Sequence, residues 1–264
     1  MNRRHFLTLA APCLLPACKT PKPGPAQPVL PPPPVPGQVF RPGPVPRRLP
    51  PGIPVSFSSC LVNGPWLAMT FDDGPHATQT PRLLDMLDRW QIKATFYVIG
   101  KNVVSHPGIV RRIVSSGHEI ANHSWSHPAL SKLSSDAVRM ELRRTHDAIV
   151  NACGTAPLNY RPPYGAITAE QKQWIAREFG YPTIMWSVDP NDWRDRNASL
   201  VSSRLKAGAR SGSIMLAHDI HASTISAMPS TLPALAARGL RFVTVSQLIS
   251  LSAGTPPLPP PMLG

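Results

Sequence analysis

The stretch that decides the fold is Trp66-Leu67-Ala68-Met69-Thr70-Phe71-Asp72-Asp73-Gly74, in which an apolar run leads into two adjacent carboxylates. The apolar residues predict a buried strand over residues 66–71. Side chains alternate between the two faces of a strand, so neighbouring acids would point in opposite directions. Gly74 permits a sharp turn of the backbone after the pair. Two charges in succession at the end of a buried strand therefore raise the question of what each of them does.

Strand and helix patterns alternate along the rest of the chain. We expect strands at 66–71, 94–99, 118–122, 160–161, 183–188, 213–217 and 241–245. Helices are expected at 80–87, 107–116, 135–152, 168–179, 200–209, 231–238 and 246–251. Strict alternation predicts a parallel sheet covered by helices. The expected fold is α/β, a distorted (β/α) barrel with about seven parallel strands and a single catalytic domain; an open, doubly wound sheet is the alternative.

The polar residues of interest follow the predicted strands, which favours the barrel. They are Asp72, Asp73, His123, Arg161, Asp189 and His218. In a barrel the carboxyl ends of all strands share one face, where catalytic residues gather from several loops. A doubly wound sheet also binds ligands at strand ends, but it does not usually draw on five of them.

Composition divides the 264 residues into four segments. We assign 1–18 to an export signal with a lipobox, 19–60 to a proline-rich linker, 61–252 to the catalytic domain and 253–264 to a proline-rich tail. The net charge is +13, and the first 54 residues supply seven positive charges and no acid, which leaves +6 for the rest. No basic stripe with aromatic or helical readout elements is present, so we expect no nucleic-acid partner.

The N-terminus predicts export. Arg3 and Arg4 form a twin-arginine pattern, and Leu15-Pro16-Ala17-Cys18 resembles a lipobox in which Cys18 takes the lipid. The run between them is too short to span a bilayer as a helix. We therefore expect a protein of the periplasm or cell envelope that is anchored to a membrane through Cys18. A cleaved, soluble exported protein is the alternative.

Cys60 and Cys153 are the cysteines that remain beyond the signal. An exported protein permits a disulfide, but the sequence does not show that the two residues are close. We expect two free thiols, with a disulfide as the alternative.

His123-Ser124-Trp125-Ser126-His127 is the second unusual stretch. Two histidines four residues apart would fall on one side of a helical turn, where both imidazoles can reach one ion. Such pairs are common by chance, and an isolated Asp-Asp-Gly-Pro is typical of a surface turn. Two histidines and one carboxylate together leave a coordination position open, as in hydrolytic metal sites. One aspartate would then bind the metal, and its neighbour would remain free to accept a proton from water.

Five motifs occur in order over roughly residues 65–250: Thr70–Gly74, His123-x-x-x-His127, Arg161–Gly165, Asp189–Trp193 and Leu216–His218. This set resembles the polysaccharide deacetylase family of carbohydrate esterases, which acts on chitin, chitooligosaccharides, peptidoglycan and xylan. The family's fold is a distorted barrel of the kind inferred above.

The resemblance implies a metal site and a base at the first three motifs. Asp73, His123 and His127 would bind the metal, with zinc expected and cobalt as an alternative. Asp72 would be the general base, and Arg161 would keep it ionised.

The remaining motifs would supply the acid and the pocket. His218 would be the general acid that protonates the leaving group, and Asp192 would orient it. The backbone N–H of Tyr164 would help to stabilise the oxyanion, while Trp193 and Leu216 would line the pocket for the acetyl methyl group.

The resemblance also implies the substrate class. We expect a metal-dependent hydrolase that removes N-acetyl groups from N-acetylglucosamine-containing glycans of the chitooligosaccharide or peptidoglycan type, acting as a monomer. An esterase that removes O-acetyl groups from xylan or another envelope polysaccharide uses the same motifs. A glycan-binding module with an inactive site is the alternative from a different class.

Three assignments stay open from the sequence. Either Asp189 or Asp192 could be the partner of His218. His76 and His221 lie close to the motifs, and each could line the cleft or serve only as a loop residue.

Overall fold

The central strand of the fold is β2, Trp66–Asp72, at the position that the apolar run predicts. In the computed structural model, which describes residues 54–252, it pairs in parallel with β3 (Thr95–Val98) and with β6 (Ile214–Met215). The beginning of β2 also pairs in parallel with β7 (Arg241–Phe242). The proposed export signal, Cys18 and the C-terminal tail lie outside the described residues.

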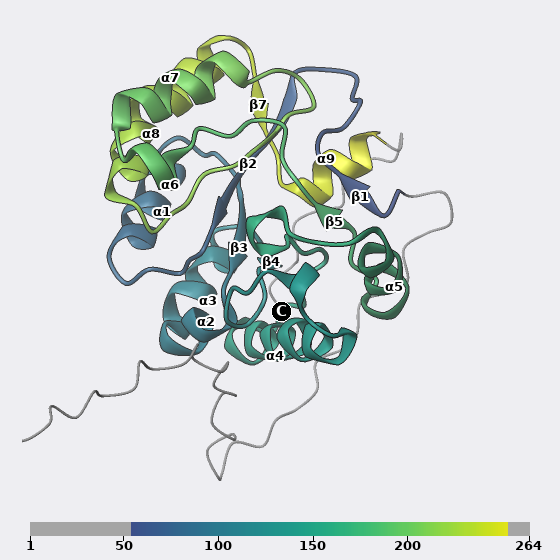
Figure 1. The fold of residues 1–264 in the computed structure, drawn as a ribbon. Coiled ribbons are helices and arrows are strands. Elements are labelled where there is room, and N and C mark those ends of the chain that lie inside the picture. The colour runs from purple at the N-terminus through teal and green to yellow at the C-terminus, as the bar shows by residue number, and fades with distance from the viewer. Residues whose placement is uncertain (1–53, 253–264) are drawn as a thin grey trace, which may run out of the picture. The chain divides into compact units, whose positions relative to one another are not determined.

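Two further sets of strands extend this arrangement (Figure 1). β4 (Glu119–Asn122) pairs in parallel with β3, while β1 (Ser56–Phe57) and β5 (Thr183–Ile184) form a separate two-stranded parallel sheet. Single-residue parallel bridges connect Asn122 with Tyr160, Tyr160 with Thr183, and Val188 with Met215. The expected α/β class with parallel strands is therefore confirmed, with isolated bridges where the barrel expectation placed full strands.

β5, β6 and β7 each cover only two residues of their predicted ranges, and two other segments differ more from the sequence expectation. Tyr160 forms only single bridges, because Pro162 and Pro163 follow and cannot donate backbone hydrogen bonds to a ladder. β1 falls within residues 19–60, which we assigned to the linker, and the Cys60 N–H donates to the Gly212 carbonyl. The folded part thus begins before residue 61, because a short strand after the prolines completes the edge of β5.

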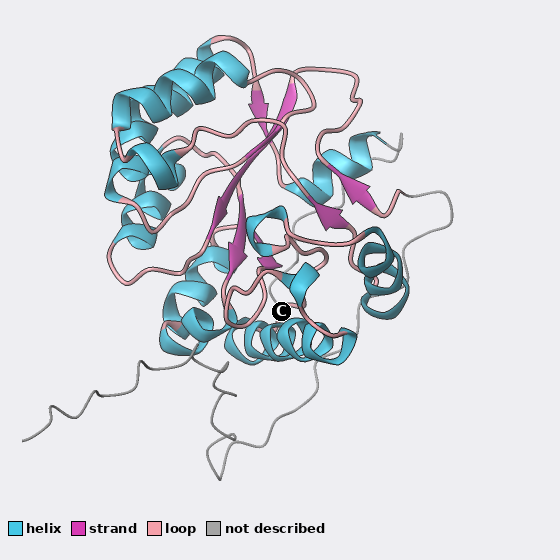
Figure 2. Ribbon diagram, viewed as in Figure 1, coloured by secondary structure: helices cyan, strands magenta, loops and turns pink. Residues whose placement is uncertain are grey.

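Helices cover the strands on their outer side (Figure 2). They are α1 (Gln79–Arg89), α2 (Gly100–Ser105), α3 (Pro107–Ser115), α4 (Ser135–Cys153), α5 (Ala169–Phe179), α6 (Asp192–Asp195), α7 (Ala198–Gly208), α8 (Ala222–Ala237) and α9 (Val245–Ser252), with short 3₁₀ turns η1 (Leu130–Lys132) and η2 (Pro163–Gly165). The sequence did not predict α2 or α6. It also placed the start of α8 too late, because Pro229 and Pro233 lie inside this helix, where buried side chains such as Met228 and Leu232 pack it in place.

The alternation of β2 decides what the strand presents to each side. Leu67, Met69 and Phe71 belong to the main hydrophobic cluster, together with apolar side chains of the covering helices. The alternate residues face the other side, where Thr70 and Asp72 are buried. A polar pair on the inner face of the central strand is the first element of the site.

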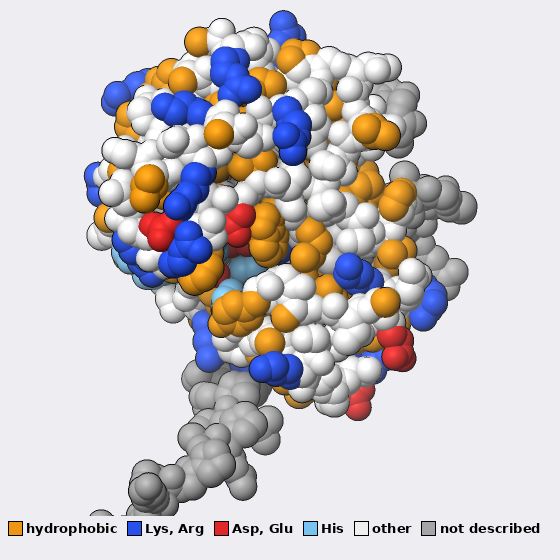
Figure 3. Space-filling view, turned by 45° about the horizontal axis from the view of Figure 1, so that its top comes forward, with side chains coloured by type: hydrophobic (Ala, Val, Ile, Leu, Met, Phe, Trp, Pro, Cys, Tyr) orange, Lys and Arg blue, Asp and Glu red, His pale blue; other side chains and the backbone are white. Residues whose placement is uncertain are grey.

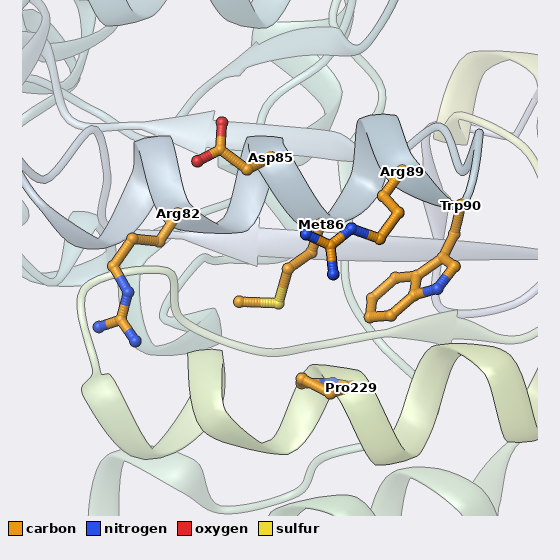
Figure 4. Close-up of a pocket in the computed structure, with 6 residues that line it drawn as sticks. All are labelled: Arg82, Asp85, Met86, Arg89, Trp90 and Pro229. Carbon is orange, nitrogen blue, oxygen red and sulfur yellow. The ribbon is translucent and has the colours of Figure 1, made fainter.

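A pocket with a volume of about 320 Å³ lies between α1 and α8 (Figure 4). Its lining residues are Arg82, Asp85, Met86, Arg89, Trp90 and Pro229. None of the motif residues lines it, so it is separate from the site described below.

Two structural findings bear on the expectations about cysteines and membranes. Among the described residues, Cys60 and Cys153 are both free thiols, as expected, the first buried and the second half-buried. Within residues 54–252, no helix has the length and apolar character needed to cross a bilayer.

Candidate functional site

The two aspartates at the end of β2 occupy different environments because the chain turns between them. Asp72 is the last residue of the strand, and its side chain is buried on the inner face. Asp73 has a φ of 74°, a left-handed conformation that residues other than glycine rarely adopt. The turn brings the Asp73 carboxylate toward two histidines, instead of toward the outer face to which simple alternation would send it.

Gly74 is needed because another residue approaches it closely. A Cβ atom at this position would collide with the carboxylate of Asp219. Asp219 accepts a hydrogen bond from Thr80 Oγ1 of α1, and burial raises its pKa to about 7. The sequence analysis expected Gly74 to permit a sharp turn. In the structure its missing side chain makes room for the Asp219 carboxylate, and the residue with the left-handed φ is Asp73.

Asp73, His123 and His127 come together as a group that could hold a metal ion. Their ligand atoms all lie within 4.8 Å of one another. Asp73 Oδ1 is 3.4 Å from His123 Nε2 and 3.1 Å from His127 Nε2. The same oxygen is buried without a hydrogen-bond partner, which is costly unless something else satisfies it. One carboxylate oxygen and two imidazole nitrogens are a set of donor atoms that suits a divalent cation.

Hydrogen bonds at the far side of both imidazoles orient them for this role. His123 Nδ1 donates to the carbonyl of Arg161 over 2.8 Å, because a carbonyl can only accept. In the neutral ring, Nε2 then carries the lone pair that faces Asp73, and histidines that bind metals commonly donate their other ring N–H to a carbonyl in this way. His127 Nδ1 lies 3.1 Å from the Tyr164 hydroxyl.

Burial opposes the charge of Asp73, but positively charged imidazoles at His123 and His127 outweigh that effect when no cation is bound, so the pKa of Asp73 lies well below the ordinary value.

Residues 123–127 form a loop and not the helical turn that the histidine spacing suggested. Ser124 and His127 have φ values of 64° and 62°, so a helix is excluded there. Glu141 of α4 holds the loop, because its carboxylate accepts hydrogen bonds from the N–H groups of Trp125 and Ser126, each at 2.8 Å. Both imidazoles still reach Asp73, but through strained backbone that tertiary contacts stabilise.

Arg161 is fully buried and connects the base candidate to the rest of the site. Its Nη1 donates to Asp72 Oδ1 and to Thr70 Oγ1, each over 2.7 Å. Its Nη2 donates to the carbonyl of Met185 over 3.1 Å, and its guanidinium lies 4.1 Å from the centre of the Tyr97 ring. Because Oδ1 of Asp72 is engaged by the arginine, Oδ2 is the oxygen that faces the histidines.

His218 and Asp192 form the second functional pair. His218 Nδ1 is 2.7 Å from Asp192 Oδ1, and the His218 N–H donates to Asp192 Oδ2 over 2.8 Å. Thr224 Oγ1 also donates to Oδ2 over 2.6 Å. Asp189 instead accepts the N–H of Asn191, which settles which aspartate contacts His218.

The charges of this pair reinforce each other. Burial opposes the charge of His218, but Asp192, and further away Asp72 and Asp73, raise its pKa to about 9. Burial likewise opposes ionisation of Asp192, yet the hydrogen bonds and charge of His218 hold its pKa below the ordinary value.

The remaining predicted residues lie around these two pairs. Leu216 is buried two residues before His218, whereas Trp193, directly after Asp192, keeps half of its surface exposed. Tyr164 is exposed and has a φ of 59°. In Figure 3 histidine side chains appear at the floor of a hollow, with acidic and hydrophobic side chains around it and basic side chains on one flank.

Several contributors to the site were missed by the sequence analysis. Thr70 was counted only as part of the first motif, yet it shares the Arg161 guanidinium with Asp72. Glu141 and Thr224 lie in helices and carry no local signal of their role. His76 accepts the N–H groups of Thr78 and Gln79 at the start of α1, which is the loop role left open for it.

Comparisons with known proteins place these features in a family context. Residues 62–184 match the family model for polysaccharide deacetylase. The chain is 43% identical over 182 residues to the peptidoglycan-N-acetylglucosamine deacetylase PgdA of Listeria monocytogenes, covering 69% of this chain and 38% of that protein. It is 34% identical over 195 residues to the chitooligosaccharide deacetylase of Rhizobium leguminosarum bv. trifolii, covering 68% of this chain and 89% of that protein. The chain thus spans well under half of the first relative and most of the second.

Solved structures agree with the sequence matches. The crystal structure of the Bc1960 peptidoglycan N-acetylglucosamine deacetylase superposes with a TM-score of 0.71 at 35% identity, covering 74% of this chain and 92% of that one. A CE4 family pseudoenzyme from Bacillus anthracis superposes with a TM-score of 0.70 at 28% identity, covering 74% of this chain and 69% of that one. The same fold therefore includes a pseudoenzyme, so the fold alone does not establish activity.

Proposed function

The chain belongs to the polysaccharide deacetylase family, and from this premise we propose that it is a hydrolase that removes N-acetyl groups from N-acetylglucosamine-containing glycans. The observation that carries the proposal is that the two adjacent aspartates have different partners. Asp72 is bonded to Arg161, while Asp73 faces two imidazoles. Because their partners differ, one aspartate is available to bind a cation and the other to accept a proton.

We propose that Asp73, His123 and His127 hold a divalent cation, with zinc as the expected metal. The cation would supply Lewis-acid chemistry, since it lowers the pKa of water and polarises a carbonyl oxygen. The buried, unpartnered Asp73 Oδ1 and the orientation of His123 by the Arg161 carbonyl support this donor set.

Asp72 would accept the proton of the attacking water at Oδ2. Its Oδ1 accepts a hydrogen bond from Arg161 Nη1, which fixes the orientation of the carboxylate. Oδ2 lies 3.7 Å from His123 Nε2, on the side where the cation ligands gather.

His218 would donate a proton from Nε2 to the departing amine nitrogen, because its Nδ1 is engaged by Asp192. When the C–N bond breaks, its electron pair goes to this protonated nitrogen, so the glycan is left with a free amine and the acetyl group is released as acetate. The Tyr164 N–H would donate to the oxyanion, and Leu216 and Trp193 would line the space for the acetyl methyl group.

The deciding experiment measures acetate release from chitooligosaccharides, peptidoglycan and acetylated xylan side by side. Release from the first two, and not from xylan, supports an N-deacetylase. Release from xylan alone identifies an O-acetyl esterase. No release from any of them, with retained glycan binding, identifies an inactive binding module.

Removing the metal is expected to abolish activity. Dialysis against a chelator should remove the cation from its three ligands, and adding zinc or cobalt should restore acetate release. Elemental analysis before and after dialysis checks that metal content and activity change together. Full activity in metal-free protein contradicts the proposed chemistry.

The basic limb of the pH profile is expected to report His218. The acid must be protonated, and its pKa is raised to about 9, so activity falls as the pH rises through that value. A cation beside Asp73 offsets part of this shift, which sets the limb at or below about 9. Asp192→Asn removes the charge that stabilises the imidazolium, so the limb should move down by about 1–3 pH units.

The matched control for this profile is Asp189→Asn. Among the described residues, the Asp189 side chain accepts a hydrogen bond only from the Asn191 N–H in the same loop, so its replacement should leave the limb where it is. A profile of kcat/KM against pH for the three proteins makes the comparison. An unchanged limb in Asp192→Asn contradicts the assignment of the acid.

We further propose that the protein is exported and anchored through a lipid on Cys18, where its substrate is an envelope glycan. The sequence of residues 1–18 supports this location. Mass spectrometry of the mature N-terminus tests it, since an unmodified N-terminus elsewhere contradicts the anchor.

A further inference from the structure

Arg196 is an arginine beside the site that has no acidic partner. Within residues 54–252 no carboxylate lies within ion-pair distance of it, whereas the neighbouring Arg194 and Arg204 both pair with Asp195. Its side chain is nevertheless fixed at two points. Nε donates to the carbonyl of Trp193 over 2.8 Å, and Nη1 lies 2.9 Å from His221 Nδ1.

These contacts leave most of the guanidinium free. Two of its five N–H donors are used, so the others, including both on Nη2, remain for a ligand. An immobilised arginine loses little further freedom when it binds a planar anion. Arg196 is the residue that ends α6, and it has a left-handed φ of 49° there.

His221 connects the Arg196 guanidinium to His218, the proposed acid. A guanidinium can only donate, so His221 Nδ1 accepts and its proton is on Nε2. The ring of His221 is buried, and its centre lies 5.7 Å from that of His218. Arg196 and His221 therefore form a fixed pair of donors directly beside the proposed acid.

The pocket between α1 and α8, which also contains arginines, is less suited to this role. Between α1 and α8, Arg82 donates to Gln79, and Asp85 is paired with Arg112 at the pocket wall. That pocket also contains none of the site residues, so an anion bound there would not affect how a glycan sits at His218.

We propose that Arg196, together with His221, binds a carboxylate carried by the glycan near the sugar that is deacetylated. The inference rests on the proposed function and sharpens it, because it selects among the glycans of that class. Chains that carry carboxylates on their lactyl or peptide substituents, as in peptidoglycan, would be preferred over uncharged chitooligosaccharides.

The size of the preference follows from a charge-assisted hydrogen bond. Such a bond between guanidinium and carboxylate corresponds to about tenfold to a hundredfold in affinity. Because the arginine is exposed, the preference should shrink as the ionic strength rises.

The experiment compares one glycan in two forms. Peptidoglycan strands with free carboxylates are tested beside the same strands after their carboxylates have been amidated. For the wild-type protein, kcat/KM should be about tenfold to a hundredfold higher on the free-acid strands. Arg196→Gln should reduce this ratio to near one, and Arg196→Lys should retain part of it because the charge remains.

Two controls separate a local contact from a general effect of charge. Arg194→Gln removes an arginine two residues away that is paired with Asp195, and Arg89→Gln removes an exposed arginine of the pocket between α1 and α8. Both lower the net charge by one, as Arg196→Gln does, and both should keep the wild-type ratio.

The outcomes distinguish this inference from the proposed function. Equal loss on both forms of the strand in Arg196→Gln means that the arginine only holds the α6 loop, and it overturns the inference. An unchanged ratio overturns it as well. Calorimetric binding of the two forms is measured in parallel, so a carboxylate preference that depends on Arg196 supports the inference even when no acetate is released and the proposed function fails.

Discussion

Replacing Asp72 by Asn should lower kcat by about 10²–10⁴-fold and leave the metal in place, whereas replacing Asp73 by Asn should lose the metal. The first change removes the group that accepts the proton. An amide at position 72 can still accept the hydrogen bond from Arg161 Nη1, so the site keeps its shape. The second change weakens a ligand, because a neutral amide binds a divalent cation less well than a carboxylate.

Metal content by elemental analysis beside kcat for each variant checks this pair. Asp73→Asn should recover part of its activity at high zinc concentration, and Asp72→Asn should not. Loss of metal in Asp72→Asn with retention in Asp73→Asn means that the two roles are reversed. Retention of both metal and activity in both variants means that the catalytic groups lie elsewhere.

Replacing Arg161 by Met is expected to be the most destabilising single change in the site, at about 3–5 kcal/mol in the free energy of unfolding. The arginine and Asp72 are both buried, and they are joined by a 2.7 Å hydrogen bond. Methionine fills a similar space but leaves a carboxylate buried without its cation. Activity should be lost too, because the base then loses the hydrogen bond from Arg161 that orients it.

A double mutant separates the buried charge from lost packing. In Arg161→Met, adding Asp72→Asn removes the uncompensated charge, so it should restore part of the stability and none of the activity. Urea unfolding of the wild type, both single variants and the double variant gives the coupling energy. If the double variant is as unstable as the sum of the single changes, the ion pair is not the cause of the destabilisation.

The outline of the fold could be predicted from local patterns, because each strand and helix is specified by its own side chains. β2, α3 and α4 lie close to where their apolar spacing placed them. Elements held mainly by tertiary contacts could not be predicted in this way. β1 depends on pairing with β5, and the first turns of α8 depend on burial that outweighs its internal prolines.

The sequence by itself predicted the acids, the histidines and the arginine of the candidate site, because five motifs in a fixed order name them, whereas Glu141 and Thr224 carry no such signal. It did not determine their geometry. The left-handed backbone at Asp73 and His127, the choice of Asp192 over Asp189 and the isolation of Arg196 from any described acid were decided by the tertiary structure. The physical reason is that conformations unfavourable for single residues, and charges without local partners, persist only where distant segments hold them in place.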